Sequence, residues 1–239
     1  MPAGALERAV ELLGRLGEQP AELTVAELAD GTGMPTSTTY RLVAELEQHG
    51  LVQRGPDSTV SLGTRLVALG RAAEAGLRDR LVAPAAPIMA ELSYEMGETV
   101  LLTAPCAREA ILLHAVEADV HSVRLSYAVY RRAPIHRGAS GKILAAFLEP
   151  AERERLLATV GAPALGLELA AIREDGYAFT SGELDEGAAA VAAPILDRRG
   201  RIVAGISIAG PAQRIEEKLG RAIAAVLDAA RAVGRADRG

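Results

Sequence analysis

The 239 residues are enough for one large domain or for two smaller domains that each bury a core of their own. Hydrophobic residues make up 49% of the chain and charged residues 24%, with no tryptophan and no long apolar run, which excludes a membrane protein and is typical of a soluble one. The single cysteine, Cys106, excludes an internal disulfide and favours a reducing cytosol, and the net charge of −5 excludes a chain that is basic throughout.

The first predicted helix carries apolar residues at helical spacing, namely Leu6, Ala9, Val10, Leu13 and Leu16. It begins within MPAGALERAVELL, where acidic residues lie among the apolar ones, so no signal peptide is expected there. We interpret this helix as the supporting member of a helical core, without chemistry of its own.

Two short helices joined by a tight glycine turn are predicted between Leu23 and Val52. Thr24 can cap the first helix at the backbone N–H of Glu27, and the Glu27 carboxylate can bond back to Thr24. Gly33 can adopt the left-handed backbone that ends this helix, and Pro35 can begin the next one. The break between the two helices is therefore encoded locally.

The second of these helices, predicted from Pro35 to about His49, has a buried face and an outward face. The buried face is expected to hold Thr39, Leu42, Val43 and Leu46. The outward face, near the helix N-terminus, is expected to hold Thr36, Ser37, Tyr40, Arg41 and Ala44. A helix seated in a DNA major groove presents side chains to base edges in this way. This segment alone leaves open an amphipathic helical hairpin with a solvated polar face.

A β-hairpin is predicted next, because the runs LVQR and TVSLG flank the turn residues GPDS. A helix-turn-helix followed by such a hairpin is a winged helix, whose wing, around Gly55 to Thr59, lies along the phosphate backbone. The segments GMPTSTTYRLVAELEQHGLVQR and VSLGTRLVALG resemble the DNA-binding domain of the IclR family of bacterial transcriptional regulators. The residues interpreted as contacts to a pseudo-palindromic, double-stranded DNA operator are Thr36, Ser37, Tyr40 and Arg41, with Arg54 on phosphate.

The charge of this region argues against a simple DNA-binding interpretation. Residues 1–62 contain four arginines, no lysine and nine acidic residues, whereas the remaining residues balance at 22 of each sign. Because nucleic-acid-binding domains normally carry a basic surface, the positive charge would here be local, at Arg41, Arg54 and Arg65, and doubled by dimerisation. The competing class is a metabolite-binding enzyme or sensor whose helical N-terminal domain mediates protein interactions.

A further helix is predicted from Thr64 to about Leu81, with its apolar residues close to one stripe. This helix suits a linker between domains. In IclR-like proteins such a helix also packs against its twin in a dimer, and an intramolecular helix is the alternative. Pro84 and Pro87 mark a predicted domain boundary near Leu81, followed by a helix that ends at Gly97.

The rest of the chain alternates predicted strands and helices. Short β-rich runs are expected in ETVLLTAP, REAILLHAVE and HSVRLSYAVY, and two adjacent strands in AAAVAAPILDRRGRIVAGISIAGP. Helices are expected in GASGKILAAFLEP, in AERERLLATV and in the long C-terminal segment QRIEEKLGRAIAAVLDAARAVG. This order predicts an α+β fold with an antiparallel sheet.

The motifs APIHRGASGKILAAF and REDGYAFTSGELDEGAAAVAAPILDRRGRIVAGISIAGP extend the resemblance to nearly the whole chain. The resemblance implies a winged helix-turn-helix at residues 1–63, a linker helix at residues 64–83 and an effector-binding domain at residues 84–239 with a GAF-like antiparallel sheet and flanking helices. It also implies a cytoplasmic homodimer, often a homotetramer built as a dimer of dimers, that responds to a small organic acid effector. The segment between Val160 and Ile172 is shorter than in the family, which leaves its helix in question.

The family's effector-contacting positions align with three places in this sequence. They are Ala139 and Ser140 in the glycine loop, Thr180 and Ala190 flanking the SGELDEG turn, and Ser207 and Ala209 on the ISIAG strand. The N–H groups of loop 138–141, ahead of a helix, suit a carboxylate. Small apolar side chains leave room, so we expect a bulkier, partly apolar acid, such as an aromatic acid from a catabolic pathway. The alternative is ordinary sheet packing with the pocket elsewhere.

Three other motifs do not predict chemistry. HRGASGKI has His136 where a phosphate-binding loop begins with glycine, and Ile143 where that loop has its magnesium-binding Ser or Thr. Ser140 and His136 lack a nucleophile elbow. Four possible metal ligands, Cys106, His114, Glu117 and His121, lie on different predicted strand faces and turns, so a shared metal site is not favoured. No catalytic set, metal or cofactor is therefore expected.

Overall fold

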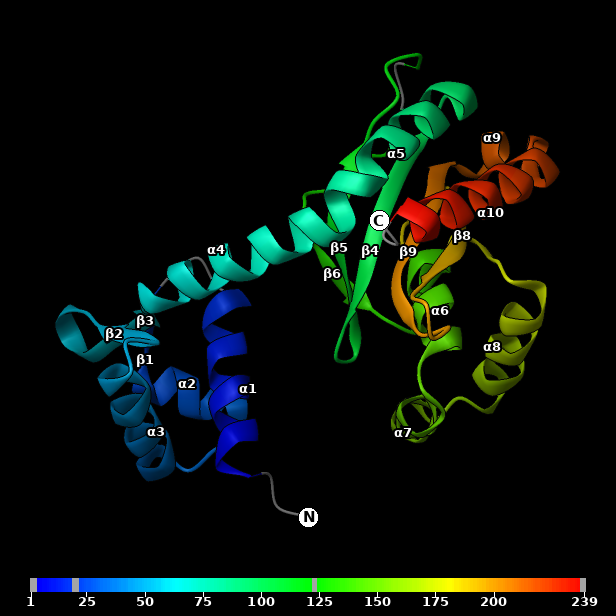
Figure 1. Cartoon of the computed structure of the whole chain (residues 1–239). Coiled ribbons are helices and arrows are strands. Elements are labelled where there is room, and N and C mark those ends of the chain that lie inside the picture. Colours follow the sequence, from blue (N-terminus) through cyan, green and yellow to red (C-terminus); the bar gives the residue numbers. More distant parts are fainter. Residues whose placement is uncertain (1–3, 19–21, 122–123, 237–239) are drawn as a thin grey trace. The chain divides into compact units, whose positions relative to one another are not determined.

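The computed structural model describes residues 4–18, 22–121 and 124–236. The chain divides into two compact units, residues 1–76 and 77–239, whose elements Figure 1 labels. Within the described residues, no helix is both long enough and apolar enough to span a membrane.

The first unit is a winged helix-turn-helix. Its helices are α1 (Ala5–Glu18), α2 (Val25–Thr32), α3 (Thr36–Gln48) and α4 (Arg65–Leu77). Its strands are β1 (Leu23–Thr24), β2 (Val52–Arg54) and β3 (Thr59–Leu62), which form an antiparallel sheet in the order β1-β3-β2. A 3-10 turn, Pro56–Ser58, joins β2 to β3, so the hairpin predicted around GPDS is confirmed.

Local signals set the helix boundaries of this unit. The Thr24 hydroxyl accepts from the Glu27 N–H at 3.2 Å, and the Glu27 carboxylate accepts from the Thr24 N–H at 2.8 Å, which confirms the capping box. Helix α2 ends at Gly33, whose φ of 65° lies in the left-handed region. Pro35 directly precedes α3, close to the predicted start of the second helix.

The core of the first unit lies beneath α3. The buried residues of that helix are the predicted ones, Thr39, Leu42, Val43 and Leu46. Helix α1 buries Leu12 and Leu16, whereas Leu6 and Val10 are 79% and 60% exposed. The prediction that Leu6 and Val10 support the core is therefore wrong, because only the later turns of α1 reach it. Helix α4 has no buried residue.

The second unit is built on a six-stranded antiparallel sheet in the order β6-β5-β4-β9-β8-β7. Its strands are β4 (Thr99–Cys106), β5 (Glu109–Val116), β6 (Arg132–Pro134), β7 (Ala178–Ser181), β8 (Ala188–Leu196) and β9 (Ile202–Pro211). Its helices are α5 (Ala83–Met96), α6 (Gly138–Phe147), α7 (Pro150–Val160), α8 (Pro163–Asp175), α9 (Ala212–Glu217) and α10 (Leu219–Ala236). The predicted α+β fold with flanking helices is confirmed.

Helices cover both faces of the sheet (Figure 1), and strand alternation decides which core each residue joins. On β8, Val191 packs with residues of α5 and α10, while Ala192 packs with residues of α6 and α8. On β9, Ile206 joins the α5 and α10 core, so Ser207 and Ala209 are on the other face, as the alternation predicts. The cavity described below opens on this second face.

One predicted strand of this unit is wrong. The run HSVRLSYAVY is predicted as a strand, but its residues 124–130 form none, and its residues 122–123 lie outside the described residues. At the domain boundary predicted near Leu81, the backbone stays helical from α4 through a π-helical stretch, Arg78–Val82, into α5, and the division between the compact units lies at residues 76 and 77. Pro84 lies in the first turn of α5, directly after the π-helical stretch. The short segment before Ile172 does form a helix, α8.

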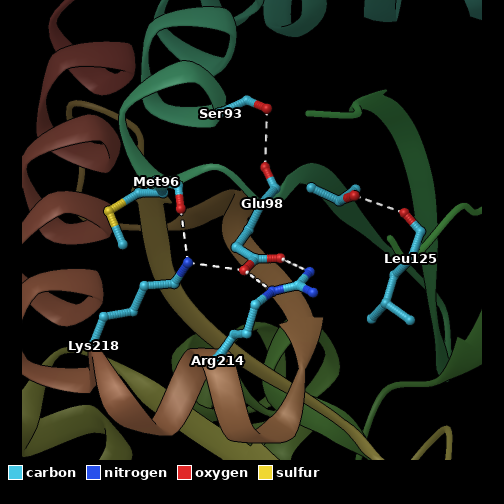
Figure 2. Close-up of polar contacts among 7 residues, drawn as sticks. Ser93, Met96, Glu98, Leu125, Arg214 and Lys218 are labelled. Carbon is cyan, nitrogen blue, oxygen red and sulfur yellow. Dashed lines mark hydrogen bonds and ion pairs between the residues drawn. The ribbon is translucent and has the colours of Figure 1, made fainter. Parts of the chain in front are cut away.

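A buried carboxylate connects the helices to the sheet (Figure 2). Glu98, whose side chain is 1% exposed, accepts from Arg214 at 2.7 and 2.8 Å and from Lys218 Nζ at 2.8 Å. Lys218 also donates to the Met96 carbonyl at 2.7 Å and lies at the break between α9 and α10, which the sequence predicts as one helix. Burial opposes the ionisation of Glu98, but the hydrogen bonds from Arg214 and Lys218 outweigh it and lower its pKa below 4.5.

Candidate functional site

Helix α3 presents a polar outer face to solvent. The predicted DNA contacts at its N-terminal end, Thr36, Ser37, Tyr40 and Arg41, are all exposed. Tyr40 is notable because an aromatic side chain usually buries much of its ring, and its exposure has no packing explanation in this unit. The position of these side chains suits insertion into a major groove, and their contact with DNA stays a prediction.

Both basic residues predicted to touch DNA are paired with acids of their own domain. Arg41 Nη1 lies 3.0 Å from Glu45 Oε1, and Arg54 Nε lies 3.0 Å from Glu47 Oε2. Exposed pairs of this kind contribute only about 0 to 1 kcal/mol, so a phosphate or a base edge can replace either acid at small cost. The acids nevertheless reduce the positive potential of this face. We therefore expect its non-specific binding to DNA to be weak.

A cavity of about 90 Å³ opens on the second unit, beside the N-terminal end of α6. Its floor is apolar and comes from strands of the sheet, through Leu101, Leu112, Ala190 and Ala209. Its walls come from residues 125–131, from residues 137–141 at the start of α6, and from the turn between β7 and β8. A hydrogen bond from Thr99 Oγ1 to the Leu125 carbonyl, 2.6 Å long, holds the wall of residues 125–131 to the sheet (Figure 2).

The structure brings the six predicted effector-contacting residues together. Five of them line the cavity, namely Ala139, Ser140, Thr180, Ala190 and Ala209. The sixth, Ser207, is buried directly behind the lining, where its hydroxyl oxygen lies 2.8 Å from that of Ser140. These positions are compatible with the predicted contacts, whose role in binding an effector stays a prediction.

The glycine loop is less available to a ligand than its sequence suggests. The Gly138 N–H donates to Glu183 Oε2 at 3.1 Å, and the Ala139 N–H donates to Thr180 Oγ1 at 2.9 Å. Both donors at the start of α6 are therefore bonded to groups of the β7–β8 region, because these side chains cap the helix. The expectation that the N–H groups of loop 138–141 receive a ligand carboxylate is therefore wrong for Gly138 and Ala139, and it stays a prediction for Ser140 and Gly141.

Lys142 of the HRGASGKI motif is also committed inside the protein. Its Nζ lies 2.5 Å from both Glu168 and Glu183, and its side chain is buried. Burial would lower the pKa of Lys142, but the hydrogen bonds that its ammonium donates to Glu168 and Glu183 outweigh this effect and raise that pKa. A lysine held by two carboxylates is a poor phosphate ligand, which agrees with our interpretation that the motif is not a nucleotide site.

Sequence reasoning missed several polar residues of the cavity, and Tyr127, Arg131 and Asp185 form one connected group among them. The Tyr127 hydroxyl donates to Asp185 Oδ2 at 2.9 Å, and Arg131 Nη2 lies 3.3 Å from Asp185 Oδ1. The Arg131 guanidinium carbon lies 4.8 Å from the centre of the Tyr127 ring. Burial and the neighbouring Asp185 carboxylate raise the pKa of Tyr127 to about 12, so its hydroxyl remains a donor. Because HSVRLSYAVY is predicted as a strand, the sequence does not predict that Tyr127 lines the cavity.

The residues considered for a metal site are not assembled into one. No group of three or more His, Cys, Asp or Glu side chains placed to hold a metal ion occurs among the described residues. Glu117 instead accepts from Arg124 at 2.7 Å and from Ser126 at 2.5 Å. These bonds fix the chain that leads into the cavity wall.

A winged helix-turn-helix in one chain with an α+β unit that holds a cavity defines a helix-turn-helix transcriptional regulator. Two family models match the chain: the IclR helix-turn-helix domain over residues 5–56 and the bacterial transcriptional regulator IclR C-terminal domain over residues 77–235. The chain belongs to the IclR family of bacterial transcriptional regulators. Proteins of this family are regulators and not enzymes, so the competing interpretation as a metabolite-binding enzyme is wrong.

Individual proteins support the same assignment. The HTH-type transcriptional regulator KipR of Bacillus subtilis is 32% identical over 95% of this chain and 94% of its own length. The structure of a putative IclR transcriptional regulator from Silicibacter matches with a TM-score of 0.80 and 25% identity, over 99% of this chain and 97% of that one. An IclR homologue from Microbacterium hydrocarbonoxydans, solved in complex with 4-hydroxybenzoate, matches with a TM-score of 0.69 and 25% identity, over 98% and 99%.

Proposed function

We propose that this regulator binds a pseudo-palindromic operator through α3 and the wing, and that a small organic acid in the cavity of the second unit controls its affinity for DNA. Thr36, Ser37, Tyr40 and Arg41 contact base edges, and Arg54 contacts phosphate. The observation that carries the proposal is the convergence of five aligned effector positions on one cavity, in a chain whose α3 leaves a polar face exposed. The regulator acts in the cytoplasm.

A gel shift with the DNA that flanks the protein's own gene tests this proposal. We expect a retarded complex that survives an excess of random competitor and whose formation changes when an acid that binds the cavity is added. A complex that random DNA removes completely would favour the remaining alternative, an N-terminal domain that binds other proteins.

The effector is a partly apolar acid larger than a short keto acid. The floor of the cavity is hydrophobic, and Ala190 and Ala209 offer no hydrogen bond to a compact polar ligand. The Microbacterium homologue, which is similar along its whole length, was solved with an aromatic acid, 4-hydroxybenzoate. An aromatic acid from a catabolic pathway has both the apolar ring and the carboxylate that such a cavity suits.

A thermal-shift panel checks the size of the effector. We expect benzoate or 4-hydroxybenzoate to raise the melting temperature, and pyruvate and glyoxylate to leave it unchanged, because a short acid cannot cover the apolar floor. Selective stabilisation by glyoxylate or pyruvate that disappears in Ser207→Ala would contradict the size argument.

The helical stretch that joins the two units carries the response. An effector can change operator affinity only if it binds the DNA-competent and DNA-incompetent arrangements differently, and residues 64–83 connect the two binding regions along the chain. The π-helical turns at Arg78–Val82 are a place where helical backbone is easily rearranged. Ala73→Pro is therefore expected to weaken the change in operator affinity on adding effector, while effector affinity stays within about twofold. Calorimetry and gel shifts on one preparation measure both quantities, and an equal loss in a folded protein would contradict this role.

The protein binds its operator as a homodimer, and a dimer of dimers is the next assembly. Helix α4 buries no residue within the chain, and its Val67 and Leu69 are exposed, as is Leu6 of α1. Apolar side chains exposed in this way are typical of helices that pack against a second copy. Leu69→Glu is expected to shift the sedimentation coefficient towards that of the monomer, whereas Arg71→Glu on the same helix serves as the control for charge alone. Unchanged sedimentation of Leu69→Glu would remove α4 from the interface.

A further inference from the structure

The turn between β7 and β8 is attached to two different walls of the cavity. On one side Glu183 bonds the start of α6, through the Gly138 N–H and Lys142. On the other side Asp185 accepts from the Tyr127 hydroxyl at 2.9 Å and from Arg131 at 3.3 Å. The turn therefore bridges two walls of the cavity, with the Glu183 carboxylate bonded to one wall and the Asp185 carboxylate bonded to the other.

The two attachments differ in strength. Lys142 is buried and lies 2.5 Å from Glu183, so replacing that carboxylate would remove one of the two acids that neutralise a buried cation. Asp185 is held by one neutral hydrogen bond, from Tyr127 at 2.9 Å, and by an ion pair with Arg131 whose side chains are 42% and 37% exposed and meet at a single 3.3 Å contact. A pair of this kind contributes little and exchanges partners readily. The Asp185 end of the turn is therefore the end that can be released.

Tyr127 and Arg131 offer what an aromatic carboxylate requires. The phenol and the guanidinium already hold the two oxygens of one carboxylate, that of Asp185, and both side chains line the cavity. The Tyr127 ring, with the guanidinium 4.8 Å from its centre, provides an aromatic surface beside these donors. The other arginine of the lining, Arg137, bonds the backbone carbonyl of Glu183, a neutral acceptor in the firmly attached part of the turn.

We propose that Tyr127 and Arg131 recognise the carboxylate of the effector, and that Asp185 occupies this recognition site as an internal substitute which the effector must displace. The inference rests on the proposed function of the cavity as an acid-binding site. It extends that function by naming the recognising residues, which lie outside the aligned positions, and by giving the effector a direct way to move the turn.

The size of the cavity supports displacement over simple addition. A dry cavity that admits benzene in another protein measures about 150 Å³, and the cavity here measures about 90 Å³. An aromatic acid therefore needs additional room. Release of Asp185 supplies it, because Asp185 is the cavity-lining residue of this turn that bonds to residues 125–131.

Because the effector and Asp185 compete for the same two side chains, substitutions of these side chains and of Asp185 should change the affinity for the acid in opposite directions. Arg131→Ala removes a charged donor and should weaken binding of the acid about ten- to hundredfold, and Tyr127→Phe should weaken it about three- to tenfold. Asp185→Asn removes the competing charge, so it should strengthen binding about three- to tenfold although it deletes an ion pair of the structure. Arg131→Lys, which keeps the charge and loses the planar fork, should restore part of the affinity.

Isothermal titration calorimetry on the full-length protein tests the proposal. The probes are benzoate, 4-hydroxybenzoate, phenylacetate, pyruvate and glyoxylate, with 4-hydroxybenzamide as the neutral partner of 4-hydroxybenzoate. The amide should bind weakly and should not respond to Asp185→Asn. Arg132→Ala and Glu109→Gln are matched controls, because that adjacent pair is 44% and 39% exposed, lies 3.0 Å apart and does not line the cavity. Circular dichroism and melting temperature establish that each variant is folded.

The outcomes separate this inference from the proposed function. If an acid binds the unmodified protein, and Asp185→Asn and Arg131→Ala change its affinity no more than the matched controls do, Asp185 is not a substitute and the inference is overturned while the effector cavity stands. If Arg137→Ala abolishes binding and Arg131→Ala does not, the carboxylate is recognised elsewhere and the inference is again overturned. If none of the acids binds, the proposed effector class fails first.

Discussion

Replacing both Arg214 and Lys218 by methionine is expected to lower the free energy of unfolding of the second unit by about 3 to 5 kcal/mol, because it leaves Glu98 charged and buried without a cation. Adding Glu98→Gln to this double variant should recover about half of the loss, since the remaining amide is neutral and buries at lower cost. Urea unfolding followed by circular dichroism measures both differences. Arg221→Met, which removes an exposed contact to the Glu95 carbonyl, should cost no more than about 0.5 kcal/mol.

The same carboxylate predicts a pH dependence. The folded-state pKa of Glu98 lies below its ordinary value of 4.5, so the stabilisation is fully present above that value and is lost as pH falls through the lowered pKa. Glu98→Gln should therefore flatten the decline in stability as the pH falls below about 4.5. A decline that is equally steep with and without the carboxylate would show that other groups titrate there.

Tyr40→Ala and Arg41→Ala are expected to lower operator affinity about tenfold or more, by removing the largest side chains of the exposed face of α3. If Arg41 pairs with a guanine, Arg41→Ala should reduce the free energy of binding to the operator by about 1 to 3 kcal/mol more than that of binding to random DNA. Sequences selected from a random DNA pool supply the operator, and fluorescence anisotropy at fixed salt measures the affinities. An equal loss on both DNAs would assign Arg41 to phosphate.

Glu45→Gln provides the matched comparison for Arg41. It removes the acid that lies 3.0 Å from the guanidinium and keeps the size of the side chain. Operator and random DNA should both bind about two- to fivefold more tightly at low salt, since the change adds one net positive charge to the face. If Tyr40→Ala and Thr36→Ala both leave operator affinity unchanged, the assignment of α3 as the recognition helix is wrong.

The sequence predicts the first unit well because the signals there act over a few residues. A capping box at Thr24, a left-handed Gly33 and a buried stripe on α3 specify helix limits without tertiary contacts. The strand face that carries Ser207 and Ala209 follows from a two-residue period for the same reason. The stripe of α1 was less well predicted, because helical periodicity does not determine how much of a helix reaches the core.

The cavity depends on contacts that no local pattern specifies. Asp185 meets Tyr127 across 58 positions of the chain, and Glu183 meets Gly138 across 45. The apolar and aromatic residues of HSVRLSYAVY have strand propensity, but the described part of that segment packs as an irregular wall. It accepts a hydrogen bond from Thr99 and donates others to Glu117, Asp185 and the Leu112 carbonyl. Alignment with the family located the small residues of the site, and the charged residues around it became visible only in three dimensions.

The hydroxyl groups of Ser140 and Ser207, 2.8 Å apart, can each act as the donor in the bond between them. When Ser207 donates, Ser140 has a proton free to give; when Ser140 donates, its remaining lone pairs can only accept. If the proposed effector reaches Ser140, a ketone oxygen and a hydroxyl group at the same place on two ligands would each meet a suitable partner without any change of side chain. This pair of hydroxyl groups therefore does not by itself select between the oxidised and the reduced form of a ligand.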